Sequence, residues 1–402
     1  MTKPSTVVDR IAIFNRGRDP ERLRLKYEAM QKDAFSFFRG TCHLYCEDWP
    51  ETSRLNDTPV VWVCGDLHVE NFAAYKGDNR LVYFDIADFD EAALAPSARD
   101  LARLATSALL AAKVRGMKRK DALSLCLVFL DAYAGALRDG KARWIERATA
   151  VGPVGSLLQA LEGRKRAPFV AARTEQRGRK IGLRIDGEHT LAADPVDRKR
   201  VKRLLREFAD QQSDPGFFRP LDVARRVAGT GSLGLERFAI LVEGRGGPGG
   251  HFILDLKLAV RSALHAHLKQ RQPRWKSEAE RVVAVARRMQ AIAPALLHAV
   301  AMDSKPYVLR ELMPSQDKLD LGKWRGSSLE VLARDLGLLV AWSEIRSGGR
   351  DSSATIDELV DFGKRTWWRE SIVDYAEHYR DVAWNDWKTF RQAYRDRSVP
   401  VR

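Results

Sequence analysis

Two short apolar runs, at residues 60–64 and 80–84, limit what this chain can fold into, because each leads into a segment that contains several acids. The runs are rich in valine and aromatic residues, and a Gly-Asp-Asn turn signal at 77–79 precedes the second. This composition predicts two strands that carry the polar loop between them. The acidic segments 65–71 and 85–91 would then be held in place by strands.

These two segments contain the residue types that phosphoryl transfer requires. Asp66 is a candidate for the carboxylate that orients an attacking hydroxyl group, and Asn71 follows it after five residues, the spacing of D-x-x-x-x-N loops. A side-chain amide and a second carboxylate can hold magnesium against phosphate oxygens. Asn71 and Asp88 are therefore predicted metal ligands.

A glycine-rich segment far downstream is a candidate lid over a nucleotide. Residues 229–234 fit G-x-G-x-x-G, a pattern that dinucleotide sites and kinase loops share. A dinucleotide site requires a helix after the glycines, whereas Phe238, Ile240 and Val242 alternate as in a strand, which favours the kinase type. The residues predicted to cover the phosphates are Gly229, Thr230, Gly231, Ser232 and Gly234.

A predicted hairpin places a lysine beside this glycine loop. The glycine-rich turn at 244–250 returns the chain into a second strand that contains Lys257, which we expect to pair with the α- and β-phosphates. A helix is predicted over 277–290. Either Glu278 or Glu280 on this helix would make the ion pair that holds the lysine.

A last strand is predicted at 306–312, leading into a hinge between two lobes. We expect Tyr307 and Leu309 of this strand to belong to the nucleotide site. Beyond the hinge, 329–343 is predicted to be an apolar helix.

The acidic segments and several other stretches of the chain resemble known families. Residues 66–71 look like the His-Gly-Asp-Leu-His-x-x-Asn loop of aminoglycoside phosphotransferases, with Cys64 where their first histidine would be. Residues 88–92, with Asp100-Leu101-Ala102 downstream, are similar to the metal-aspartate segment of those enzymes. The chain as a whole resembles family 2252 of the domains of unknown function, a bacterial group thought to be related to protein kinases. Phe37-Phe38-Arg39-Gly40 and Tyr307-Val308-Leu309-Arg310 extend the resemblance over most of the length.

Other aspartates have alternative interpretations. Asp85 competes with Asp88 as metal ligand, and the two point to opposite faces of a strand, so both cannot hold one metal without a turn or bulge. The spacing to Asp100 favours Asp88, and Asp85 would keep a shorter loop. Asp100 itself is expected to cap a helix or brace a loop. Asp361 begins an Asp-Phe-Gly tripeptide inside a helical pattern, which we treat as a chance match.

The order of the parts predicts a circular permutation. In ordinary kinases the glycine loop precedes the catalytic loop, whereas here it follows. The resemblance implies an α+β, two-lobed, protein-kinase-like fold with a small antiparallel sheet lobe and a larger, mainly helical lobe. We expect residues 1–215 to form the helical lobe with the catalytic and metal loops, and residues 216–325 to form the sheet lobe. Residues 326–402 are expected to form helices that complete the helical lobe.

Composition indicates the surroundings and partners of such a protein. The apolar runs of this 402-residue chain are shorter than the roughly 20 residues of a membrane span, and its start lacks a signal-peptide pattern, so we expect a cytoplasmic protein without a membrane partner. The formal net charge of +15 suits an acidic or phosphorylated substrate. A nucleic-acid partner is less favoured, because the basic run at 198–203 has the pattern of a solvated helix face.

The leading hypothesis is an ATP- and magnesium-dependent phosphotransferase that acts on a hydroxyl-bearing acceptor. Nucleotidyl transfer on the same scaffold is an alternative, and the mass of the product formed from labelled ATP would separate the two. A basic nucleic-acid-binding or regulatory protein without chemistry is the alternative from another class. Its affinity would fall steeply with salt and would survive the loss of Asp66.

Overall fold

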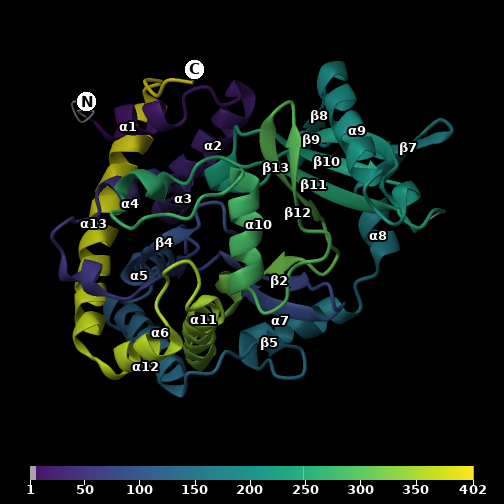
Figure 1. Ribbon diagram of the computed structural model, residues 1–402. Coiled ribbons are helices and arrows are strands. Elements are labelled where there is room, and N and C mark those ends of the chain that lie inside the picture. Colours follow the sequence, from purple (N-terminus) through teal and green to yellow (C-terminus); the bar gives the residue numbers. More distant parts are fainter. Residues whose placement is uncertain (1–5, 248, 402) are drawn as a thin grey trace.

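The computed structural model describes residues 6–247 and 249–401. The described chain is α+β, as predicted, with most helices gathered on one side and a six-stranded sheet on the other (Figure 1). The α-helices are α1 (Val7–Phe14), α2 (Pro20–Lys32), α3 (Ala34–Gly40), α4 (Cys42–Glu47), α5 (Ala98–Val114), α6 (Arg119–Asp139), α7 (Gly152–Glu162), α8 (Arg166–Ala171), α9 (Pro195–Ala209), α10 (Glu278–Met289), α11 (Ser327–Ser347), α12 (Ile356–Lys364) and α13 (Trp367–Arg395).

Antiparallel pairing organises all the strands. The largest sheet has the order β12-β13-β11-β10-β9-β8, and a second has the order β14-β2-β3-β5. Two smaller pairs are β1 with β4 and β6 with β7. The strands are β1 (Val60–Val63), β2 (Phe72–Lys76), β3 (Val82–Ile86), β4 (Ala93–Pro96), β5 (Ile145–Glu146), β6 (Thr174–Arg177), β7 (Lys180–Leu183), β8 (Thr190–Ala192), β9 (Pro220–Arg226), β10 (Arg237–Val242), β11 (Phe252–Leu258), β12 (His298–Met302), β13 (Lys305–Glu311) and β14 (Asp317–Lys318).

The helical part is built around α5, whose alanine-rich sequence is buried almost throughout, with α6 and α13 packed against it. Small side chains allow this close approach. α13 contributes one apolar stripe to this packing, because its buried residues recur every three or four positions. These residues are Trp368, Ile372, Ala376, Tyr379, Ala383, Trp387 and Phe390. Within the described residues, no helix combines the length and the apolar character needed to cross a membrane.

The six-stranded sheet has two different faces. Alternate residues of its central strands, including Ile240, Leu254 and Leu256, share a core with the apolar stripe of α9. The opposite face is covered in part by α8 and the β6–β7 pair, through Val170 and Leu183. The rest of this face carries charged side chains toward the helical part.

Residues 190–209 pack with the sheet, which differs from the expected boundary at residue 216. β8 extends the sheet beyond β9, and Val201 and Leu205 of α9 are buried against it. The apolar stripe of α9 therefore needs the sheet for its burial.

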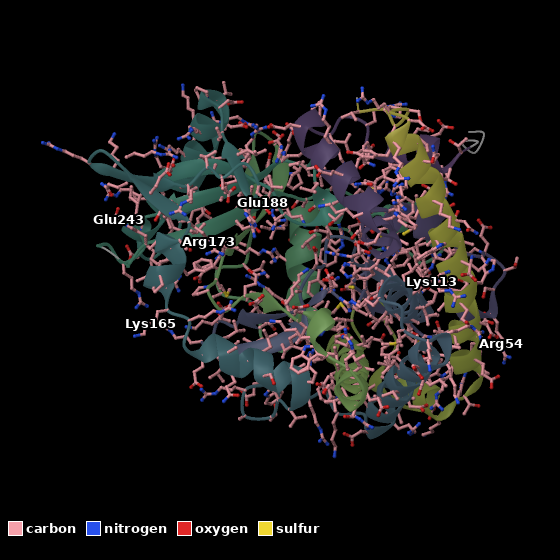
Figure 2. All side chains as sticks on the ribbon, turned by 180° about the vertical axis from the view of Figure 1, so that it is seen from behind. Arg54, Lys113, Lys165, Arg173, Glu188 and Glu243 are labelled. Atoms are coloured by element: carbon pink, nitrogen blue, oxygen red, sulfur yellow. The ribbon has the colours of Figure 1, made fainter. Side chains whose placement is uncertain are left out.

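Basic side chains are spread widely over the surface, as the labelled Arg54, Lys113, Lys165 and Arg173 illustrate (Figure 2).

Candidate functional site

Residues from segments that are distant in sequence line one cleft between the six-stranded sheet and the helical part. Segments 65–71 and 85–91 come from the helical side, and 229–234 comes from the sheet side. In Figure 1, α10 stands at this junction, where it contacts β13 and α11. The cleft has a cavity volume of about 100 Å³. Its lining includes Arg18, Arg39, Asp66, His68, Asn71, Asp88, Asp90, Gly229, Thr230, Gly231, Ser232 and Lys318.

Asp66 is positioned by a buried arginine. Arg103 of α5 donates to Asp66 Oδ1 through Nε at 2.7 Å and also through Nη2. Burial raises the pKa of Asp66, and the charge of Arg103 opposes that rise. Oδ2 lies on the side of the glycine loop, since a Cβ atom placed on Gly231 would be 3.9 Å from it. One oxygen is thus held by the protein while the other faces the cleft.

Asp100 braces the start of this loop, one of the two roles that its position predicted. Its Oδ2 accepts the N–H of Cys64 at 2.7 Å, and its Oδ1 accepts the N–H of Gly65 at 3.0 Å. Gly65 has a φ of +83°, and a Cβ atom there would lie 2.1 Å from the carbonyl oxygen of Glu91. Glycine therefore lets the two acidic segments approach each other. Burial raises the pKa of Asp100 to about 6, against the effect of the two N–H donors.

Replacing Asp100 with asparagine is expected to lower the free energy of unfolding by about 1–3 kcal/mol, because its amide group cannot accept both backbone hydrogen bonds and a buried N–H loses its partner. Urea denaturation measures this difference. Asp121→Asn is the matched control, since Asp121 lies exposed in the first turn of α6. It should change the free energy by no more than about 0.5 kcal/mol. Equal midpoints for wild type and Asp100→Asn would contradict the bracing role.

Asn71 and Asp88, the two predicted metal ligands, both line the cleft. Asn71 is buried, and its Nδ2 donates to the carbonyl oxygens of Asp66 at 3.1 Å and Asp88 at 3.3 Å. Within the described part of the chain, no hydrogen bond reaches its Oδ1. The Asp88 side chain is 51% exposed. An amide oxygen and a carboxylate, both ligand types that magnesium accepts, thus remain available.

Metal binding here would need ligands from outside the chain. Among the described residues, no group of three His, Cys, Asp or Glu side chains is arranged to hold a metal. Magnesium is usually held in proteins by one or two carboxylates, with substrate phosphates and water completing its shell. Asp88 and Asn71 fit that pattern.

Lys257 reaches the acidic segment from the sheet. The hairpin of β10 and β11 pairs Arg237 with Lys257, and the Lys257 Nζ lies 3.7 Å from Asp88 Oδ2 and makes an ion pair with Asp90. The partial burial of Asp88 would raise its pKa, but the charges of Lys257 and Arg310 outweigh this and lower it to about 2. Asp88 is therefore an anion at neutral pH, next to the lysine predicted to bind phosphates.

The predicted ion pair between Lys257 and Glu280 is wrong. Glu280 accepts the backbone N–H of Lys276 at the start of α10, and the alternative candidate Glu278 binds Arg281. Both glutamates satisfy groups at the beginning of their own helix. Asp90 is the residue that makes the ion pair with Lys257 instead.

The side chains of Tyr307 and Leu309, two residues predicted to belong to the nucleotide site, do not face the cleft. Both are buried in the core between the sheet and α9, and the Tyr307 hydroxyl donates to Glu236 at 2.6 Å. Side chains alternate along a strand, so Val308 and Arg310 of β13 face the helical part instead.

Asp85 is a structural residue and does not line the cleft. It is 1% exposed, and its Oδ2 accepts the N–H of Ala291 at 3.0 Å and lies 3.1 Å from Nη2 of Arg346. These contacts tie β3 to α11 and to the segment after α10. The structure thus decides between the two aspartates in favour of Asp88 as the one that faces the cleft.

The glycine loop is docked on α2 and on Arg18 in the turn before it. Arg18 donates to the carbonyl oxygens of Gly231 at 2.8 Å and Leu233 at 3.0 Å, and Lys26 donates to that of Gly231 at 3.1 Å. Gly234 has a φ of +92°, and a Cβ atom there would lie 2.8 Å from the Cβ of Arg18. The glycine therefore provides both the backbone angle and the space for this contact.

Three arginines converge on Asp255, on the same face of the sheet as Lys257. Arg237 donates to its two oxygens at 2.8 and 2.6 Å, while Arg226 and Arg310 lie 2.7 and 3.2 Å from Oδ2. Burial would raise the pKa of Asp255, but the three cations keep it well below its usual range. The cluster carries net positive charge beside the cleft.

Sequence reasoning missed Arg103, Arg18 and Lys26. A signal for Arg103 was present, because it follows Asp100 by three residues on a predicted helix and so shares its face. No local pattern indicated that Arg18 and Lys26 would bind a loop more than two hundred residues away.

Two larger cavities, of about 610 and 670 Å³, contain none of the predicted site residues. The residues with candidate chemistry line the small cleft and a pocket of about 40 Å³, and Asp88 and Asp90 line both. Lys257 lines the smaller pocket. The cleft volume lies below the roughly 300–1,000 Å³ of typical ligand pockets, so a nucleotide would have to displace the docked glycine loop.

Comparison with known proteins supports a family assignment. No curated protein and no solved structure matches the chain. A family model described as "Uncharacterized protein conserved in bacteria" matches residues 18–393, which include the cleft segments 65–71, 85–91 and 229–234. On this match, the chain belongs to family 2252 of the domains of unknown function (DUF2252).

Proposed function

We propose that this protein is a magnesium-dependent phosphotransferase that uses ATP to phosphorylate a hydroxyl-bearing acceptor. The observation that carries the proposal is that Lys257 Nζ, from the sheet, lies 3.7 Å from Oδ2 of Asp88, which lines the cleft together with Asp66 and Gly231. These are the groups that phosphoryl transfer uses to orient a nucleophile and to neutralise phosphate charge.

Each residue has a role that its surroundings permit. Asp66 would accept a hydrogen bond from the acceptor hydroxyl through Oδ2 while Arg103 holds Oδ1. Asn71 and Asp88 would hold magnesium, which when bound neutralises charge on the phosphate oxygens. Lys257 would exchange its contact with Asp90 for the phosphates.

We also propose that the fold is a circularly permuted, kinase-like arrangement. Its support is the sheet with a glycine loop and lysine hairpin on one side of the cleft and the Asp66 loop on the other, joined by α10. For nucleotide to enter, the glycine loop would have to leave Arg18 and Lys26. Nucleotide binding would then be coupled to an opening movement of this loop.

Thermal denaturation with and without ATP and magnesium tests the proposal. Ligand that binds the native state at about 100 times its dissociation constant adds about 2.7 kcal/mol to stability, so the melting temperature should rise, and rise less without magnesium. Lys257→Ala should lose this rise. Lys305→Ala, an exposed lysine of the same sheet paired with Glu236, should keep it. No shift at millimolar ATP and magnesium would reject the proposal.

A further inference from the structure

A second pocket lies in the helical part and shares no lining residue with the cleft. It is formed by the end of α6, by β5 and by α11, and has a volume of about 670 Å³. This is within the range of small-molecule sites. Its lining includes Asp139, Arg143, Trp144, Glu146, Asp335 and Trp342.

The unusual feature of this pocket is the carboxylate of Asp335. The residue is only 8% exposed, and its Oδ2 is enclosed without a hydrogen-bond partner. Within the described part of the chain, no hydrogen bond or ion pair involves either carboxylate oxygen. Burial raises the pKa of Asp335 to about 7, and the charge of its neighbour Arg334 only partly opposes this. A buried carboxylate without a partner is costly, and a cation in the pocket would remove that cost.

The charged residues of the lining are mostly acidic, and two of its apolar residues are tryptophans. The lining carries three acidic residues, Asp139, Glu146 and Asp335, and one basic residue, Arg143. A nitrogen of Arg143 already lies 3.0 Å from a carboxylate oxygen of Asp139. This local excess of acid stands out in a chain of net charge +15. Two indole rings, of the half-exposed Trp144 and the buried Trp342, also belong to the lining. Indole faces attract organic cations and also pack against apolar groups.

We propose that this pocket binds an organic ammonium ion, whose charged nitrogen pairs with Asp335 and whose apolar body packs against Trp144 and Trp342. The site is separate from the cleft, so the proposal does not depend on phosphotransfer. A carboxylate that the fold leaves unpaired at the wall of a pocket is explained by a ligand that supplies the missing positive charge.

Isothermal titration calorimetry with n-hexylammonium tests this, with n-hexanol as the uncharged probe of nearly the same shape. We expect hexylammonium to bind wild type at least tenfold more tightly than hexanol. Asp335→Asn should lose this preference, while Asp131→Asn, which changes an exposed carboxylate on α6, should keep it. Equal affinity of wild type and Asp335→Asn for hexylammonium, or no binding by wild type, would overturn the proposal.

The pH dependence provides a second readout. The ionised form of Asp335 binds the cation, so affinity should rise about tenfold from pH 6 to pH 8, as expected for an acid with a pKa of about 7. Arg334 of its own helix is the charged group that acts on Asp335, while Asp139, Arg143 and Glu146 line the same pocket. A pH-independent affinity would contradict the pairing.

A variant at the pocket mouth keeps the test decisive if Asp335→Asn fails to fold. Trp144 is 51% exposed, so Trp144→Ala should fold normally. It should weaken hexylammonium binding severalfold through the lost ring contact. Unchanged affinity in this variant would place the ligand elsewhere and overturn the proposal.

Discussion

Replacing Asp66 with asparagine is expected to reduce ATP-dependent turnover by about 10²–10⁴-fold, the usual contribution of a general base. The asparagine keeps the size of the side chain but removes the charge that would draw a proton from the acceptor hydroxyl. Turnover would be measured as ADP formed in the presence of magnesium and a mixed pool of hydroxyl-bearing metabolites. ATP-induced thermal stabilisation should persist, because Lys257 and Asp88 are unchanged.

This variant also affects stability, and the experiment has to account for that. Arg103 is fully buried and would lose its counter-charge, which destabilises a protein more than the loss of an exposed ion pair. Assays should therefore be run well below the melting temperature of the variant. Asp361→Asn is the matched control, because Asp361 is an exposed helix residue that pairs only with Lys364 among the described side chains. Equal turnover for Asp66→Asn and Asp361→Asn would rule out the role of Asp66.

Replacing Asp255 with alanine is expected to lower the free energy of unfolding by about 3–5 kcal/mol. Asp255 is 1% exposed, and its removal would leave Arg226, Arg237 and Arg310 facing one another without an anion. Guanidinium chloride denaturation at neutral pH would measure the loss. Asp131→Ala removes a carboxylate that is 65% exposed beside Arg369, and should change the free energy by less than about 1 kcal/mol.

The Asp255 effect should depend on pH with a defined sign. The folded pKa lies well below the ordinary value, so this carboxylate adds stability that is fully present above the unfolded pKa of about 4. That contribution is lost as the pH falls toward the folded pKa. The difference between wild type and Asp255→Ala should therefore shrink below about pH 4. A difference that stays constant down to pH 2 would show that the ion cluster is not its source.

Local patterns predicted most elements of the site correctly. The strands at 60–64 and 80–84, the hairpin that carries Lys257, and the helix over 277–290 are all present within a few residues of their predicted bounds. These features depend on alternation, helical spacing and turn residues, which are properties of neighbouring positions. The boundary of the sheet unit was placed too late, since the burial of α9 depends on strands far along the chain.

The sequence by itself determined which residues share a face of an element, which segments carry acids, and where the hairpin turns. Only the tertiary structure decided which face of each element meets the cleft. Tyr307 faces α9, and Asp88 lines the cleft while Asp85 is buried. Asp90, and not Glu280, makes the ion pair with Lys257. The physical reason is that a strand's side-chain period of two residues groups its positions without saying which group faces which neighbour. That choice is made by the burial of apolar groups and the pairing of charges between segments that are remote in sequence.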